Sequence, residues 1–256
     1  MIIGTDISTY QDSPYTTTVI DFAKMHAAGA GFVYIKATQG NFYDNDFKVN
    51  HANSAGILPR GLYHFYDWRY PLAANIDAIV NAWTAYPTEL PPMLDYESQI
   101  SIPDKATAAG LCLSALKEIE RRTGKTPLLY TNPNIWALYG STKIDFAHFP
   151  LWIAHYGVAK PTVPAPWTNW TFWQYSSKGD GAAYGVESAS IDLDYFNGTL
   201  EDFKAWGGLN PPPPPVPPAP TLDERVKALE SKVDEHESRI QALESLYHIY
   251  LPTVTK

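Results

Sequence analysis

Residues 91–97 have the sequence Pro-Pro-Met-Leu-Asp-Tyr-Glu, a short apolar run that ends in two carboxylates separated by one aromatic residue. Successive side chains of a β-strand point to opposite faces, so Met93, Asp95 and Glu97 would share one face. A buried acid needs a partner, whereas a cleft in which acids do chemistry suits two carboxylates well. The alternative is a strand end at which both acids are simply solvated.

The composition of the whole chain limits the classes of protein to which it can belong. With 256 residues the chain can build one large domain or two smaller ones. A formal charge of -8 and a pI near 5.3 argue against nucleic acid or an anionic membrane surface as partner. Cys112 is the only cysteine, so an intrachain disulfide and a thiolate metal site are excluded. Eight Trp and 17 Tyr exceed what packing usually requires, which favours stacking on sugars or bases.

Strands and helices alternate through the first 140 residues. The segment 107–123 is the clearest helix, with Leu111, Leu116 and Ile119 on one face and a stop at Gly124. Strands are predicted at 2–7, 32–38, 61–66, 91–97 and 128–131, and helices at 19–28, 46–54, 72–86, 107–123 and 134–139. This repeat predicts parallel strands joined by right-handed crossovers.

Three more strands, at 151–156, 171–176 and 190–196, follow with connections rich in Pro or Gly, which are poor helix formers. Eight strands with five helices predict an α/β fold, an irregular eight-stranded TIM-like barrel of roughly (βα)5β3 form. An open doubly wound sheet is the competing fold.

A barrel would bring acids from distant segments to one mouth, because the carboxyl ends of parallel strands converge there. Asp6, Asp95 with Glu97, and Asp192 all stand near predicted strand ends. Five further side chains occupy comparable positions and are candidate substrate contacts: Lys36, Tyr63, Tyr130, Trp152 and Gln174.

Six motifs occur in order along the chain: Gly4-Thr5-Asp6-Ile7-Ser8, Lys36-Ala37-Thr38-Gln39-Gly40, Gly61-Leu62-Tyr63-His64-Phe65, Leu94-Asp95-Tyr96-Glu97, Trp173-Gln174-Tyr175 and Ile191-Asp192-Leu193-Asp194-Tyr195-Phe196-Asn197-Gly198. Together they resemble glycoside hydrolase family 25 over about residues 1–206. The family comprises lysozymes, often phage endolysins, that cut peptidoglycan between N-acetylmuramic acid and N-acetylglucosamine. The resemblance therefore implies a muramidase that acts on bacterial cell walls.

The resemblance also implies roles for the acids. Glycoside cleavage needs a proton donor and negative charge near an oxocarbenium-like transition state. Glu97 would be the general acid, with its pKa raised by the charge of Asp95. Asp95 would stay ionised and position the substrate's N-acetyl group or a water. Asp6 and Asp192 would complete the ring of acids. Asp192 and Asp194 share a strand face, but alignment with the family motif favours Asp192, with Asp194 bracing the strand.

The stereochemical outcome stays open, because the distance between two carboxyls depends on their rotamers. The family's carbohydrate chemistry favours a retaining route in which the N-acetyl group attacks the anomeric carbon. A hard-cation site is an alternative use of the acids, but no acidic loop of calcium-binding spacing is present. We predict no metal and no cofactor.

The aromatic candidates have two possible uses. Tyr63, Tyr130, Trp152 and Tyr156 suit the stacking of sugar rings and suit a barrel interior equally well. Lys36 is expected to pair with a carboxylate at the mouth rather than to act as a nucleophile. The histidines at 64 and 155 lack a Ser or Cys partner at a recognisable spacing, so both are interpreted as structural.

The chain divides into a predicted catalytic barrel at 1–208, a proline-rich linker at 209–221 and a coiled-coil helix at 222–251. The heptads place Val226, Val233 and Ile240 at position a and Leu222, Leu229, His236 and Leu243 at d. Basic g and acidic e positions attract in parallel identical chains, so we expect a parallel homo-oligomer, a dimer or a trimer.

The leading hypothesis is a cell-wall muramidase, in keeping with a phage lysin. The alternatives are a catalytically silent barrel that binds glycan in a virion or adhesin, and a glycosidase for another N-acetylated polymer such as chitin. The chain begins without a signal peptide or membrane span. We therefore expect no membrane partner, and release by a holin-like partner or delivery with a virion.

Overall fold

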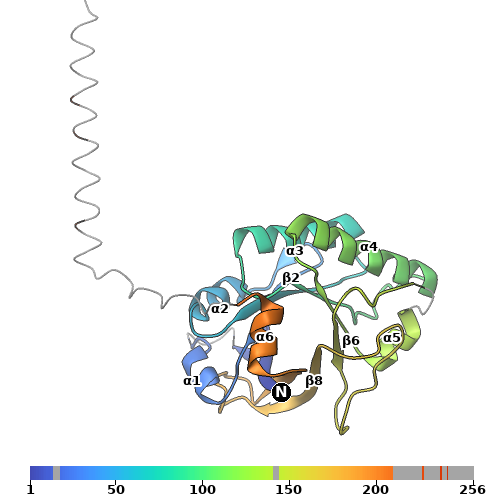
Figure 1. Ribbon diagram of the computed structural model, residues 1–256. Helices are drawn as coiled ribbons and strands as arrows, with labels where there is room; N and C mark the ends of the chain where they lie inside the picture. The colour runs from blue at the N-terminus through green and yellow to red at the C-terminus, as the bar shows by residue number, and fades with distance from the viewer. Residues whose placement is uncertain (14–17, 141–143, 210–226, 228–236, 238–240, 242–256) are drawn as a thin grey trace, which may run out of the picture. The chain divides into compact units, whose positions relative to one another are not determined.

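The computed structural model describes residues 1–13, 18–140 and 144–209, together with Lys227, Glu237 and Gln241 (Figure 1). The chain divides into two units, Met1–Pro212 and Pro213–Lys256. Apart from those three single residues and residue 209, the predicted linker and coiled coil lie outside the described residues.

Eight strands form a closed barrel, as predicted. β1 pairs with both β2 and β9, which closes the ring in the order β1-β9-β8-β7-β6-β5-β4-β2. A short strand, β3 (Phe42–Tyr43), is added to β2 as a hairpin. The barrel strands are β1 (Ile2–Ile7), β2 (Val33–Gln39), β4 (Arg60–Phe65), β5 (Met93–Asp95), β6 (Leu128–Thr131), β7 (Leu151–Ala154), β8 (Phe172–Asp180) and β9 (Ser190–Phe196).

The last strand departs from the parallel pattern. β9 runs antiparallel to both β8 and β1, whereas the other neighbouring barrel strands are parallel. Gly4 pairs with Asp194, so Asp192, which comes earlier in β9, lies nearer to the end of β1 that carries Asp6. The reversed direction thus decides which of the two aspartates reaches the mouth.

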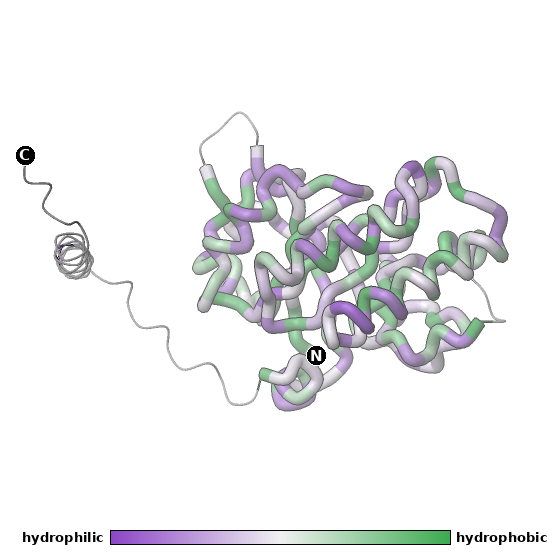
Figure 2. The backbone as a smooth tube through the Cα atoms, turned by 90° about the horizontal axis from the view of Figure 1, so that it is seen from above, coloured by the Kyte–Doolittle hydropathy of each residue, from purple (hydrophilic) through white to green (hydrophobic). Residues whose placement is uncertain are grey.

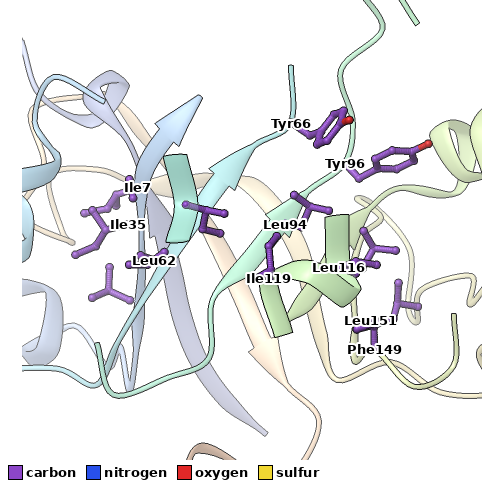
Figure 3. Packing of buried hydrophobic residues seen from close by; sticks show 14 of the residues in the cluster. Ile7, Ile35, Leu62, Tyr66, Leu94, Tyr96, Leu116, Ile119, Phe149 and Leu151 are labelled. Atoms are coloured by element: carbon purple, nitrogen blue, oxygen red, sulfur yellow. The ribbon is translucent and has the colours of Figure 1, made fainter. Parts of the chain in front are cut away.

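Helices cover the outside of the barrel (Figure 1). They are α1 (Phe22–Ala27), α2 (Phe47–Asn53), α3 (Leu72–Ala85), α4 (Lys105–Thr123) and α5 (Pro133–Tyr139). Hydrophobic and hydrophilic positions intermingle along them (Figure 2), as expected of helices that cover a core on one side. Leu94 of β5 packs with Leu116 and Ile119 of α4 in this outer core (Figure 3). None of the helices in the described ranges has the length and apolar character needed to cross a membrane.

An unpredicted helix, α6 (Leu200–Gly207), packs on the interior aromatic cluster of the barrel. Thr199 and Asp202 form a capping box that starts this helix. Phe203 stacks on Phe32, which directly precedes β2, and Trp206 contacts Phe172 at the start of β8. Because these partners stand at the amino ends of strands, α6 covers the barrel end opposite the mouth, which we call the floor.

The stretch 91–97 forms a shorter strand than predicted, and Glu97 lies two residues beyond its end. The alternation of faces nevertheless continues. Met93 belongs to the interior cluster, and Leu94 and Tyr96 belong to the outer core. The carboxylates at 95 and 97 line a cleft at the mouth.

Candidate active site

The mouth of the barrel holds a cleft of about 330 Å³, which we call the acid cleft. The four predicted acids, Asp6, Asp95, Glu97 and Asp192, all line it. They come from β1, from β5 and the residue two beyond it, and from β9. Of the predicted substrate contacts, Lys36, Tyr63, Tyr130 and Gln174 line the same cleft. The fold therefore gathers eight of the nine predicted site residues.

Asp6 is fixed by a network of neutral side chains. Gln174 donates from Nε2 to Asp6 Oδ2 over 2.6 Å. The Gln174 Oε1 atom accepts hydrogen bonds from the hydroxyls of Tyr130 at 2.8 Å and Tyr156 at 2.5 Å. These three hydrogen bonds are compatible with only one orientation of the Gln174 amide. The amide thus holds the Asp6 carboxyl in place without a cation.

Asp194 lies behind Asp6, fully buried. Its Oδ1 accepts a hydrogen bond of 3.1 Å from Nε1 of Trp152. Asp194 also interacts with Asp6, and two carboxyls in contact share a proton, because two ionised carboxylates have none to donate. Burial and the charge of Asp6 raise the pKa of Asp194 well above its ordinary value, so Asp194 carries this proton. The predicted bracing role of Asp194 matches this position.

Burial dominates the electrostatics of the acid cleft. It raises the pKa of Asp6 to about 8, with a further contribution from the charge of Asp192. It also raises the pKa of Asp192 to about 6. Carboxylates that lose water lose their main stabilisation, so protons stay bound at higher pH than on a free side chain.

Asp95 and Glu97 both have raised pKa values. Burial is the main cause for both carboxyls. The charge of Glu97 raises the pKa of Asp95 further. The charge of Asp192 raises the pKa of Glu97 further. The expectation that Asp95 supplies the charge acting on Glu97 is therefore wrong. Burial makes Glu97 able to keep a proton, as a general acid must.

Lys36 is the cationic side chain among the described residues that line the acid cleft. Its predicted ion pair with a carboxylate is absent from the described ion pairs. The ammonium instead donates to Oε1 of Gln39 at 2.9 Å and lies 5.0 Å from the ring centre of Phe65. Its charge still lowers the pKa of Asp95 and of Glu97.

Trp152 cannot stack on a sugar, because its side chain has no exposed surface. Its ring stacks on Phe172 inside the barrel, with centroids 4.7 Å apart. Of the two roles that the sequence left open for Trp152, sugar stacking and packing inside the barrel, the fold gives it the second. Tyr63 and Tyr130 are mostly buried but present an edge to the cleft, and Tyr156 is 47% exposed at its rim.

Both predicted structural histidines have protein partners. His64 is fully buried between the hydroxyl of Thr38 at 2.8 Å and Oδ1 of Asn75 at 2.9 Å. Burial lowers its pKa to about 4, so it stays neutral. His155 accepts a hydrogen bond from the Thr162 amide. No group of three His, Cys, Asp or Glu side chains suited to a metal ion occurs within the described ranges.

Sequence reasoning missed two parts of the surface around the acids. Tyr10, 79% exposed in the turn after β1, lines the acid cleft with Ser8 and Gln11. A second hollow of about 520 Å³, the side groove, adjoins the cleft and shares Glu97, Tyr130 and Tyr156 with it. The turn-prone residues after β1 could have predicted that Ser8, Tyr10 and Gln11 lie at the mouth.

Comparison with known proteins agrees with this geometry. The family model for glycosyl hydrolases family 25 matches residues 5–183. Lysozyme M1 of Streptomyces globisporus is 34% identical over 215 residues, covering 77% of this chain and 68% of the relative. An N,O-diacetylmuramidase of a Chalaropsis species is 34% identical over 217 residues, covering 78% of this chain and 96% of the relative.

Solved structures of similar fold include a bacterial lysozyme from Streptomyces coelicolor and a family 25 glycosyl hydrolase from Bacillus anthracis. The first superposes with a TM-score of 0.68 and 29% identity, over 80% of this chain and 96% of its own. The second has a TM-score of 0.69 and 26% identity, over 81% and 94%.

Proposed function

The chain belongs to glycosyl hydrolases family 25, and from that premise we propose that it is a muramidase. It cleaves the β-1,4 bond between N-acetylmuramic acid and N-acetylglucosamine in bacterial peptidoglycan. The observation that carries this proposal is the convergence of Asp6, Asp95, Glu97 and Asp192 on one cleft. The lysozyme and muramidase names of the relatives supply the substrate class.

Glu97 is the proton donor in this proposal. Its raised pKa keeps the acid form available, and its place on the border of the acid cleft and the side groove puts it between two sugar sites. Donation of its proton to the glycosidic oxygen lets the bond to the anomeric carbon break.

Asp95 holds the acetamido group of the sugar under attack. Its carboxyl lines the acid cleft and accepts no hydrogen bond from the side chains of the described residues, so it is free to accept one from the substrate N–H. That contact would aim the acetamido oxygen at the anomeric carbon for a retaining route. Water would then open the cyclic intermediate and return a proton to Glu97.

Asp192, with a pKa of about 6, supplies negative charge around the developing oxocarbenium ion at neutral pH, and Asp6, with a pKa of about 8, places a polar carboxyl beside it. Both face the same cleft, and their positions are held by β1 and β9 rather than by flexible loops. Preorganised charge of this kind needs no rearrangement during the reaction.

The test is digestion of purified peptidoglycan by the wild type and by Glu97→Gln. We expect the substitution to lower kcat about 10²–10⁴-fold, as loss of a general acid does. Glu201→Gln is the matched control, because the Glu201 side chain is 76% exposed on α6. Equal activity of wild type and Glu97→Gln would overturn the assignment.

The same assay separates the two alternative functions. A silent glycan-binding barrel would retain the polymer without releasing reducing ends. A chitin-type glycosidase would release ends from N-acetylglucosamine oligomers and leave peptidoglycan intact.

We propose further that residues 1–208 are the catalytic domain, 209–221 a linker and 222–251 a parallel coiled coil. The heptad pattern supports a dimer or trimer of catalytic domains, whose avidity would suit a polymeric wall. A phage lysin released by a holin-like partner or carried by a virion fits this design. Sedimentation at micromolar concentration tests it, and a monomer would contradict it.

A further inference from the structure

An irregularity in β2 brings Gln39 to the same side of the strand as Lys36. The register of β2 against β4 shifts between Lys36 and Thr38, as it does at a β-bulge. Side chains three positions apart in a regular strand point to opposite faces, whereas the extra residue of a bulge lets them share one face. Gln39 pairs with Phe65, which lines the acid cleft as Lys36 does. The bulge therefore places the Gln39 amide beside the Lys36 ammonium.

The Gln39 amide forms a hydrogen bond at each end. Its Oε1 accepts from Nζ of Lys36 over 2.9 Å, and its Nε2 donates to Oδ2 of Asp67 over 3.2 Å. An ammonium can only donate and an ionised carboxylate can only accept, so the amide has a single orientation between them. A neutral side chain that both accepts and donates is therefore needed at position 39.

Asp67 is a firm anchor for this amide. The Arg69 guanidinium donates to it from Nε over 2.9 Å and from Nη2 over 2.5 Å, and the Arg69 backbone amide donates over 3.0 Å. Hydrogen bonding to Arg69 is the main reason that the pKa of Asp67 falls to about 2, so this carboxyl is ionised at neutral pH. Oδ1 of Asn75 accepts from the Asp67 backbone amide and fixes the same loop. The acceptor that Gln39 offers to Lys36 is thus held from behind.

Besides the tyrosine hydroxyls, the titratable side chains around Lys36 come from several parts of the chain. They lie on β1, on β4, on β5 or just beyond it, on β9 and in the segment before α2, and they are Asp6, His64, Asp95, Glu97, Asp192 and Asp44. None of these carboxyls forms an ion pair with Lys36 in the ranges that the structure describes. Lys36 therefore acts on the acids through space, without direct contact.

We propose that Gln39 is a positioning residue, which holds the Lys36 ammonium in the acid cleft as a cation that no carboxylate neutralises. This inference rests on the proposed function and extends it. A carboxylate at position 39 would pair with Lys36 and cancel its charge, and it would also repel Asp67. The neutral amide does neither, so the charge of Lys36 stays available to Asp95 and Glu97.

The charge of Lys36 opposes the effect of burial on the two central acids. Burial raises the pKa of Asp95 and of Glu97, and the charge of Lys36 lowers both. Asp95 must lose its proton to accept a hydrogen bond from the substrate, whereas Glu97 must keep its proton for the glycosidic oxygen. The position of Lys36 therefore helps to set the pH range in which the enzyme is active.

The test is the pH profile of kcat/KM on soluble peptidoglycan fragments, because this ratio reports the titration of the free enzyme. Gln39→Glu should move the alkaline limb, where Glu97 loses its proton, to higher pH by about half a unit or more, since the nearby cation is cancelled. Lys36→Met removes the same cation and should move the limb in the same direction.

Asn41→Asp is the matched control. It adds the same negative charge two residues along the chain, at an exposed position that does not line the acid cleft. Water and salt screen a charge there, so its alkaline limb should stay within about 0.2 pH units of the wild type. Thermal unfolding shows which of the variants are folded.

An alkaline limb that stays in place in an active Gln39→Glu variant would overturn the positioning role. A loss of the same size at every pH would also overturn it, because position 39 would then matter for packing alone. If Gln39→Glu does not fold, an unmoved limb in Lys36→Met has the same consequence. A wild type that leaves peptidoglycan uncut would instead contradict the proposed function, and this inference with it.

Discussion

The two ends of the barrel are built from the same strands and differ in nearly every physical property. At the mouth, carboxyl groups line an open cleft, and burial raises their pKa values. At the floor, Phe203 and Trp206 of α6 pack against Phe32, Phe172 and Phe196 in stacked and edge-to-face contacts. The floor contributes stability, whereas the mouth gives up stability for chemistry.

The difference also explains how the fold tolerates so many acids at one site. Each desolvated carboxyl costs free energy, which the aromatic floor and the outer core must offset. Substitutions at the two ends should therefore have opposite effects on stability and on activity.

Phe203→Ala is expected to give the largest change in stability. The ring is 1% exposed and packs on Phe32 and Phe196, so its removal should cost about 3–5 kcal/mol of unfolding free energy. Urea unfolding measures this loss. Leu200→Ala, at a 54% exposed position of the same helix, should change it by less than about 1 kcal/mol. A small loss for Phe203→Ala would show that α6 does not seal the floor.

Asp194 joins the two ends, because it binds Trp152 of the interior and Asp6 of the mouth. Asp194→Ala should cost about 2–3 kcal/mol, since it leaves the buried Trp152 N–H without a partner and removes the contact of Asp194 with Asp6. Asp194→Asn keeps a donor and an acceptor and should cost about 1 kcal/mol or less. Thermal unfolding of both variants, with kcat and its pH profile, checks this. Equal losses for Ala and Asn would contradict the shared proton.

The pH dependence of stability should follow the titration of the buried acids at the mouth. Asp6 has an ordinary pKa of 3.8 when unfolded and about 8 when folded, so the folded state binds more protons between those values. Stability should fall as pH rises from about 4 to 8. Asp6→Asn removes this titration and should make the fall in stability less steep, while the other buried acids still titrate. Urea midpoints at pH 5 and pH 8 measure it, and a wild type that gains stability toward pH 8 would contradict the burial of Asp6.

Much of the barrel could be predicted from the sequence, because buried parallel strands are short apolar runs with distinct stops. The strands at 2–7, 128–131 and 190–196 end where the structure ends them. α6 was missed because it is short and follows the last strand, where no further βα unit was expected. The antiparallel direction of β9 depends on pairing with β1, which no local pattern reveals.

The acids of the site could be predicted because several strand ends carry them, but their surroundings could not. Burial of Trp152 depends on which rings fill the barrel. The proton on Asp194 depends on its contact with Asp6, from a segment far away in the chain. The side groove arises where α5 and β7 meet the end of β5, so no local pattern in the sequence predicts it.

We propose that Glu97 cuts the bond whose leaving sugar is N-acetylglucosamine. The most direct measurement is digestion of purified peptidoglycan by the wild type, borohydride reduction of the new ends and mass spectrometry of the hydrolysed sugars. We expect reduced muramic acid at the new ends, and none from Glu97→Gln. Reduced glucosamine at those ends would contradict it.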